Sequence, residues 1–287
     1  MKIICLLGFL YKLKFLLLML LSQLISFLEN RIAPKAFAMK NDVYGIQFGQ
    51  TLEDRNIKKV MITLDPSLDA IIEASKQKVS LLLSYYGLIH RPTLYFHDNL
   101  VKKFRLLSIS RIILYVLHSA FEAAQNGISE ILANKLFLKI EDLFYFKNKF
   151  GNQAPLGRIC VPEKILGKER PLILNKLIER IKKTLDLKYI RYIGELNKEI
   201  KKICIMGSVS TESLLNAVEA GCDCYLTRQL NYDDALLARD LDIVLIETSH
   251  FESEIIGMNE LHKILSIEFP RDPFILYNSN DPFSYDF

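Results

Sequence analysis

The sequence predicts an α/β protein of two similar halves, each built on a mixed or parallel sheet, with a crevice between them. Short apolar runs alternate with segments of helical periodicity along most of the 287 residues. Each apolar run ends in polar residues just before the next helix begins. In α/β folds such strand ends line the crevice where ligands bind, so the pattern also predicts where a site lies.

The same alternation divides the chain into three segments. Residues 1–18 are an apolar extension, residues 19–150 the first α/β half, and residues 151–287 the second half. Glycines at 151 and 157 mark the boundary. Residues 135–165 are less regular, and the pattern assigns no helix or strand there.

In the first half, the pattern predicts a turn and a short strand over 41–49, followed by a β-α-β unit. The unit consists of an apolar strand over 58–67, a helix over 67–78 with Ser67 as its N-cap, and a strand over 79–86. Such a unit pairs its two strands in parallel. Residues 110–136 then read as a strand, a loop and a helix interrupted at Asn126–Gly127.

The second half repeats this order. Helices are predicted over 169–185, 211–221, 231–242 and 253–265, and strands over 201–210, 222–228 and 243–251. The sequence contains no phosphate-binding glycine motif of the P-loop or dinucleotide type.

Composition indicates a globular protein without a concentrated basic face. Half of the residues are hydrophobic, 24% are charged, and the net charge is +4. Acidic and basic residues are mixed even in the lysine-rich stretch 177–202, which argues against nucleic-acid binding through the lysines there or through Arg228.

The cysteines favour a reduced, cytoplasmic protein. Five are present, Cys5, Cys160, Cys204, Cys222 and Cys224, an odd number without the spacing of a disulfide framework. The Cys222-x-Cys224 pair fits free core thiols better than a zinc site, which would require two further ligands.

The N-terminus leaves two interpretations open. The uninterrupted apolar run 15–21 is too short to span a bilayer, and no cleavage site of the signal-peptide type follows it. We therefore expect an extension before a cytoplasmic domain, with Met19 as a possible true start. The alternative is export, with residues 1–18 acting as a signal.

Three predicted strand ends carry side chains that could bind a metal. Tyr85 and Tyr86 are followed by His90, and the other two strand ends supply the pairs His118 with Glu122 and His250 with Glu254. Each of these pairs has a spacing of four residues, which places both members on one face if the chain is helical there. A carboxylate and an imidazole together form a suitable set of ligands for a divalent cation.

Several of these segments, in this order and spacing, resemble the GTP cyclohydrolase I type 2 homologue family, also called the NGG-one-interacting-factor-three-like family. The segments are "APKAFAMKNDVYGIQFG", "ITLDPSLDAIIEASKQKVSLLLSYYGLI", "LHSAFEAAQNGISEILANKL", "PLGRICVPE", "GCDCYLTRQLNYDDALLARDLDIVLIETSHFESE" and "NDPF". The resemblance covers residues 20–287. It implies a toroidal homohexamer whose subunits each carry a two-metal centre.

The resemblance also implies which residues would form that centre. The family's final His-x-x-x-Glu is retained as His250 and Glu254, and its Asp, four residues after a His, is replaced by Glu122. Its His-His-Pro is replaced by Tyr85-Tyr86-Gly87. The metal ligands predicted for this chain are therefore Glu122, His250 and Glu254, with His118 as a possible fourth.

Other departures from the family pattern fall in the same crevice. Thr-Gly-Glu/Asp reads Thr227-Arg228-Gln229 here, a His in the following helix is replaced by Asp233, and the Gly before the last His is Ser249. The glycine-rich Gly-Gly-Ser-Gly turn appears as residues 207–210, Gly-Ser-Val-Ser.

These exchanges predict an incomplete site. A phenol with an ordinary pKa near 10 is a poor metal ligand, and the extra methylene of Glu122 displaces its carboxylate. Either one divalent cation binds at the remaining ligands, or none binds and Arg228 places a permanent positive charge there.

Two functions remain open. One is a non-catalytic, ring-forming oligomer whose crevice binds a small molecule or a partner. The other is a metal-dependent hydrolase acting on a small molecule or nucleotide, for which no catalytic residue is assigned.

Overall fold

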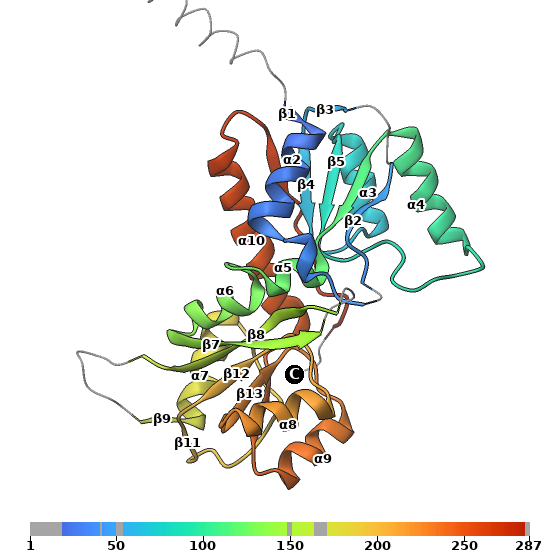
Figure 1. Ribbon diagram of the computed structural model, residues 1–287. Coiled ribbons are helices and arrows are strands. Elements are labelled where there is room, and N and C mark those ends of the chain that lie inside the picture. Colours follow the sequence, from blue (N-terminus) through green and yellow to red (C-terminus); the bar gives the residue numbers. More distant parts are fainter. Residues whose placement is uncertain (1–18, 41, 50–53, 148–150, 164–170, 285–287) are drawn as a thin grey trace, which may run out of the picture.

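The computed structural model describes residues 19–40, 42–49, 54–147, 151–163 and 171–284. Two sheets lie at opposite ends of the molecule, each covered by helices (Figure 1). This is the α/β architecture with parallel and mixed sheets that the sequence predicts. The apolar segment 1–18, with Cys5, lies outside the described residues.

The first sheet has five strands. In spatial order they are β15 (Phe274–Leu276), β4 (Val60–Thr63), β5 (Leu81–Ser84), β6 (Ile113–Val116) and β2 (Gly45–Phe48). The first four run parallel and β2 is antiparallel to β6. Every residue of β4, β5 and β6 is buried, as expected for parallel strands covered on both faces.

Helices from distant parts of the chain cover the two faces of this sheet. One face packs against α2 (Leu21–Phe27) and α10 (His250–Glu268), and the other against α3 (Leu68–Lys76) and α4 (Asp98–Ile109). Ser67 caps α3 by accepting a hydrogen bond from the Ala70 amide, as predicted. The π-helical turn η1 (Leu28–Ile32) continues α2, and the short 3₁₀ helix η2 (Lys35–Phe37) follows.

The second sheet has six strands. In spatial order they are β10 (Tyr192–Ile193), β14 (Val244–Glu247), β13 (Cys224–Thr227), β12 (Ile203–Ile205), β8 (Gln153–Pro162) and β7 (Leu138–Lys147). β12, β13 and β14 are parallel, and the outer strands are antiparallel to their neighbours. Its faces pack against α6 (Ile128–Lys135) and α7 (Leu174–Leu185) on one side and α8 (Thr211–Glu219) and α9 (Tyr232–Asp240) on the other.

Most of the less regular stretch 135–165 forms the hairpin of β7 and β8, two strands of ten residues each. This hairpin belongs to the second sheet, and β15 brings the C-terminal end back to the first. The two sheets therefore do not follow the segment boundary placed at residue 150. Two small ladders complete the fold, β1 (Met19–Leu20) with β3 (Asn56–Ile57) and β9 (Leu172–Ile173) with β11 (Glu199–Ile200).

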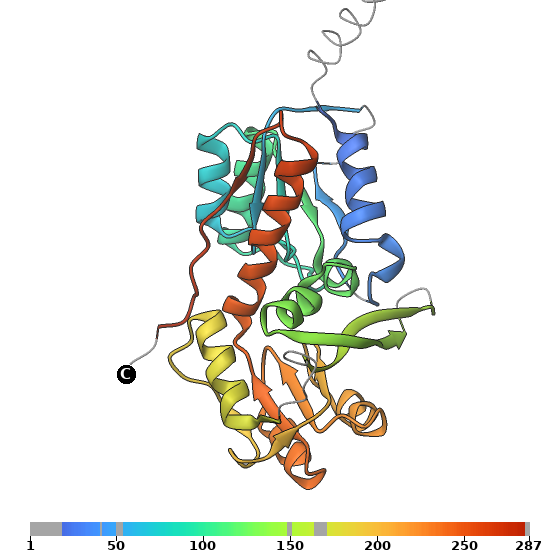
Figure 2. The same ribbon diagram turned by 90° about the vertical axis from the view of Figure 1, so that its left-hand side faces the viewer.

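Helices link the two halves. α10 starts at the end of β14 in the second half and runs along the first sheet (Figure 2), while α5 (His118–Ala123) and α6 lie between the sheets (Figure 1). Gly257 of α10 allows the close approach of α6, because a Cβ there would lie 2.7 Å from a side-chain carbon of Ile128.

Cys160, Cys204, Cys222 and Cys224 are free and buried, in agreement with their expected role as core thiols. Burial raises the pKa of Cys160 to about 12 and that of Cys222 to about 11, so both stay protonated. Within the described residues, no helix is long and apolar enough to cross a membrane.

Candidate functional site

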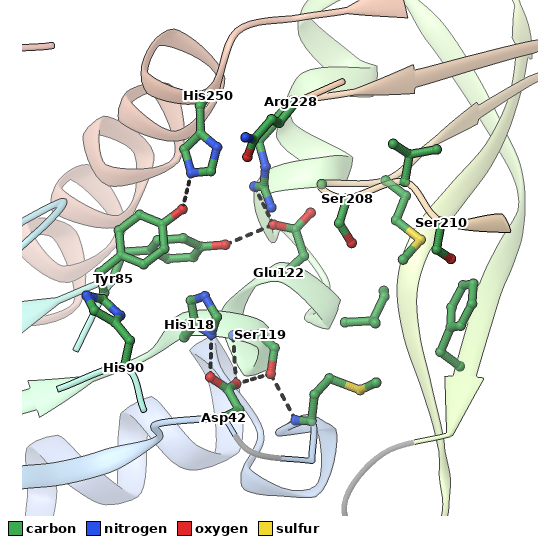
Figure 3. A pocket seen from close by; sticks show the side chains of 18 of the residues that line it. Asp42, Tyr85, His90, His118, Ser119, Glu122, Ser208, Ser210, Arg228 and His250 are labelled. Carbon is green, nitrogen blue, oxygen red and sulfur yellow. Dashed lines mark hydrogen bonds and ion pairs between the residues drawn. The ribbon is translucent and has the colours of Figure 1, made fainter. Parts of the chain in front are cut away.

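The carboxyl ends of parallel strands from both sheets meet at one crevice, as predicted (Figure 3). Tyr85 and Tyr86 directly follow β5, and their amides extend its pairing to the carbonyls of Thr63 and Leu64. Arg228 follows β13 of the second sheet. The side chains of both halves therefore point into a common space.

Glu122 lies on α5 and is only 4% exposed. Its Oε2 accepts hydrogen bonds from the Tyr85 hydroxyl at 3.1 Å and from Nη1 of Arg228 at 2.6 Å. Its Oε1 accepts a hydrogen bond from the hydroxyl of Ser129 on α6. Donors from three elements thus surround this carboxylate and hold it in place.

A buried arginine fixes the helix that carries Glu122. Arg158 of β8 is 1% exposed, and its guanidinium donates to the carbonyls of Ala123 and Ala124 at the end of α5. It also forms an ion pair with Glu130 at 3.2 Å. Arg158 therefore satisfies carbonyls that α5 itself leaves open and sets the position of Glu122.

His250 and Glu254 lie in the first turns of α10, on one face, as their spacing predicts. His250 Nε2 is 3.3 Å from Glu254 Oε1, and the Tyr86 hydroxyl donates to the same oxygen at 2.6 Å. The Tyr86 hydroxyl also contacts His250 Nε2. With the phenol proton directed at Glu254, the second contact requires an N–H on Nε2 of His250.

Ser249 precedes this helix with an unusual backbone. Its φ of 63° and ψ of 142° fall in a backbone region that residues other than glycine rarely adopt. Ser249 lies between the end of β14 and the start of α10, so its backbone belongs to the turn that leads into His250. A glycine would adopt this conformation at lower cost.

Arg228 lies between the two buried carboxylates. Nη1 is 2.6 Å from Glu122 and Nε is 3.4 Å from Glu254, whose side chain is fully buried. The guanidinium passes over Gly207, where a Cβ would collide with its Nη2 and Cζ atoms. One permanent cation thus bridges the acidic groups of the two halves.

The environment keeps the phenols neutral. Burial is the main cause that raises the pKa of Tyr85 and Tyr86 above the ordinary value, and neighbouring carboxylates add to it. Burial also raises the pKa of Glu254 to about 7, against the opposing effect of Arg228. Burial, together with Arg228, lowers the pKa of His250 to about 4, so the imidazole is neutral at pH 7.

His118 packs its ring against the phenols of this cluster, with its centre 5.4 Å from that of Tyr85 and 5.3 Å from that of Tyr86. Its Nδ1 pairs with Asp42, whose other oxygen accepts from the amide and hydroxyl of Ser119. Burial alone would raise the pKa of Asp42, but the interactions with His118 and the hydrogen bonds from Ser119 together lower it. His90 lies at the edge of the crevice, with its ring 5.9 Å from that of Tyr86.

The sequence matches the family described as Duf34/NIF3 (NGG1p interacting factor 3) over residues 19–282. The chain belongs to this family. The Duf34/NIF3 chain is 29% identical over 244 residues to a protein named GTP cyclohydrolase 1 type 2 homolog from Methanocaldococcus jannaschii. This match covers 85% of the chain and 93% of the relative. The family resemblance drawn from the sequence is thereby confirmed.

Solved structures share the fold of this Duf34/NIF3 chain. Staphylococcus aureus protein SA1388 superimposes with a TM-score of 0.78 at 22% identity, covering 94% of this chain and 100% of that one. Reduced HcgD from Methanocaldococcus jannaschii gives a TM-score of 0.74 at 26% identity, with 92% and 100% covered.

The site of this Duf34/NIF3 chain does not fit a divalent metal centre. Glu122 and Glu254, the carboxylates that would bind a cation, both face the guanidinium of Arg228. The phenols direct protons at these same oxygens instead of offering lone pairs. Among the residues that the structure describes, no group of three or more His, Cys, Asp and Glu side chains is arranged to hold a metal ion.

The predicted ligands Glu122, His250 and Glu254 therefore do converge, but around an arginine. Sequence reasoning did not find Asp42, Ser129 and Arg158, which position the cluster from other elements. Of the three, only Arg158 stands out in the sequence, as a charged residue within the apolar segment "PLGRICV".

The crevice is a cavity of about 720 Å³ between the two halves. One wall carries the phenols and imidazoles of the first half together with Arg228 (Figure 3). The other carries polar and apolar side chains of the second sheet and the segments next to it, namely Phe146, Leu156, Met206, Ser208, Val209, Ser210, Glu212, Gln229, Asn231 and Asp234. This volume suits a small organic molecule.

Proposed function

We propose that this chain is a ring-forming homo-oligomer of the Duf34/NIF3 family that binds a small molecule without hydrolysing it. In this account an arginine-centred ion cluster takes the place of the divalent-metal centre that the family resemblance implies. The cavity between the halves is kept as a binding site, while metal-dependent chemistry is lost.

The position of Arg228 is the observation that carries this proposal. Its guanidinium lies 2.6 Å from Glu122 and 3.4 Å from Glu254, two carboxylates that burial would otherwise leave uncompensated. A divalent cation bound to these two carboxylates would lie next to the guanidinium of Arg228, and the two positive charges would repel each other. Arg228 cannot lose its proton to make room for one.

The second candidate is a metal-dependent hydrolase acting on a small molecule or nucleotide. The relatives' name, GTP cyclohydrolase 1 type 2 homolog, favours it. Such a reaction draws its nucleophile from water bound to a metal ion. Because the donor set around Arg228 suits a guanidinium rather than a metal, we favour binding.

Self-association is supported by an exposed apolar loop. Leu94, Tyr95 and Phe96 are 90%, 86% and 56% exposed, an arrangement that monomeric proteins usually avoid. We propose that this loop contributes to contacts between subunits of a homohexamer. Substitution of all three residues by Ser is expected to reduce the mass measured by light scattering, while far-UV circular dichroism stays unchanged.

Chelation tests the proposal as a whole. The oligomer mass and the melting temperature of the purified protein are measured before and after exhaustive treatment with EDTA. We expect both to stay the same, because the ion cluster contains its own cation. Dissociation of the oligomer, or a fall in melting temperature that added Zn²⁺ or Mn²⁺ reverses, would refute it.

A further inference from the structure

A carboxylate on the second-half wall of the cavity lacks a partner. Asp234 lies in the first turn of α9, is 7% exposed and lines the cavity. Its Oδ2 is buried and makes no hydrogen bond within the described part of the chain. An unpaired buried carboxylate oxygen is costly, so its place at a cavity wall points to a ligand that supplies the missing donor.

Asp234 is not part of the arginine cluster. It belongs to the turn where Asn231 caps α9 by accepting a hydrogen bond from the Asp234 amide at 2.8 Å. This turn adjoins α8, whose own first turn begins after Ser210. The carboxylate therefore defines a second polar region of the cavity.

The charge of the cavity favours a cation. Its lining carries four carboxylates, on Asp42, Glu122, Glu212 and Asp234, and two permanent cations, on Lys40 and Arg228. Apart from the imidazoles, the lining therefore has a formal excess of two negative charges. Such an excess raises the local concentration of cationic ligands and disfavours anions.

The helix N-termini at this wall do not reverse that preference. Asp233 and Asp234 occupy the first turn of α9, and Glu212 occupies that of α8. These carboxylates already match the positive ends of the two helix dipoles. A phosphate at this wall would therefore meet negative side chains.

We propose that Asp234 anchors the protonated amino or amidinium group of a small organic cation, whose body lies against apolar side chains of the same wall. Those side chains are Phe146, Leu156 and Met206. An ammonium or amidinium group supplies Oδ2 with a charge-assisted hydrogen bond, the strong kind for a carboxylate. This inference rests on the proposed ligand-binding role of the cavity and names the class of its ligand.

Three probes of equal shape test it on the unmodified protein. Benzamidine, benzamide and benzoate are titrated by calorimetry at pH 7, and they differ mainly in charge. We expect benzamidine to bind with a Kd of about 1 mM, at least about tenfold tighter than benzamide, and benzoate not to bind. Equal affinity for benzamide, or no saturation by benzamidine at about 20 mM, would overturn the inference.

Substitutions then locate the anchor. Asp234→Asn is expected to weaken benzamidine binding about tenfold, and Asp233→Asn, which changes the exposed neighbour in the same turn, to leave it unchanged. Asp234→Ser serves as a second variant. Retained affinity in either Asp234 variant, or failure of both to fold, contradicts an anchoring role.

The metal content of the same sample separates this inference from the proposed function. A stoichiometric divalent metal would refute the proposed function. A metal-free protein that does not prefer benzamidine would refute only the assignment of Asp234.

Discussion

The guanidinium of Arg228 occupies the space that a side chain on residue 207 would need, and Gly207 leaves that space free. The two positions lie at the ends of neighbouring parallel strands, β12 and β13, and the Arg228 amide donates to the Gly207 carbonyl at 3.3 Å. The ion cluster thus depends on a pair of residues, one that brings the charge and one that makes room for it.

Gly207→Ala is expected to lower the free energy of unfolding by about 1–3 kcal/mol, because the new methyl group displaces the guanidinium from Glu122. The loss should nearly vanish when Arg228→Gly is the background. Urea unfolding of the four proteins of this double-mutant cycle measures the coupling. Additive losses would show that Gly207 is needed for another reason.

Arg228→Met is expected to lower the free energy of unfolding by about 3–5 kcal/mol, since it leaves two buried carboxylates without a counter-charge. Adding Glu122→Gln and Glu254→Gln should restore most of that loss. Arg239→Met, at an exposed position on α9, controls for removal of an arginine. A variant at position 228 that unfolds like this control would disprove the bridging role of the guanidinium.

Ser249→Gly is expected to raise the free energy of unfolding by about 1 kcal/mol, because glycine relieves the strain of a φ of 63°. Ser249→Ala keeps the strained backbone and loses the hydroxyl that donates to Glu252, so it should be destabilising. Thermal melts of both variants compare the two effects. If both substitutions destabilise equally, the hydroxyl and not the backbone decides the choice of Ser249.

Glu254 should make stability depend on pH. Burial raises its pKa from 4.5 to about 7 in the folded chain, so the folded state holds the proton more tightly than the unfolded state. The contribution of Glu254 to the free energy of unfolding is therefore fully present below about pH 4.5 and is lost as the pH rises through 7. The lowered pKa of His250 acts in the opposite sense, because its contribution is present above pH 6.5 and lost as the pH falls through about 4.

The effect of Glu254 therefore has to be isolated by substitution. The difference in free energy of unfolding between Glu254→Gln and the unmodified chain should rise in favour of the variant by about 1–3 kcal/mol as the pH increases from 4.5 to 7. Chemical unfolding at several pH values measures this difference, and Glu260→Gln on the same helix serves as a control. A difference that stays constant with pH would contradict the raised pKa.

Much of the fold was predictable because local signals agree with tertiary structure. Ser67 caps α3 as expected, and the four-residue spacing of His250 and Glu254 does place them on one face of α10. The hairpin of β7 and β8 was missed. Most of β7 is partly or fully exposed and carries charged residues such as Glu141 and Asp142, which weakens the alternation that identifies a strand.

The site was predictable in outline and not in its contacts. Parallel strand ends must meet at one edge of a sheet, so the convergence of Tyr85, Tyr86 and Glu122 follows from topology. The pairing of His118 with Asp42 joins positions 76 residues apart, and no local sequence pattern predicts such a contact. The charge of Arg228 suggested a substitute for a cation, but only the structure gives its place between two carboxylates.

Restoring the residues of the family pattern at the positions where this chain differs should rebuild a metal site. The variant Tyr85→His, Tyr86→His, Glu122→Asp and Arg228→Gly removes the permanent cation and supplies two imidazoles with free lone pairs. We expect it to bind Zn²⁺ or Mn²⁺ and to gain melting temperature on addition of the metal. The same variant with Arg228 retained is the matched control and should bind no metal. Equal metal binding by both would show that Arg228 does not exclude cations.

The most direct measurement is the metal content of the unmodified protein. The purified chain is saturated with Zn²⁺, Mn²⁺, Fe²⁺ or Mg²⁺, passed through gel filtration, and analysed by inductively coupled plasma mass spectrometry. The arginine-centred cluster predicts less than about 0.1 metal ion per chain. One or two tightly held ions per chain, released when Glu122 and Glu254 are replaced by Gln, would contradict it.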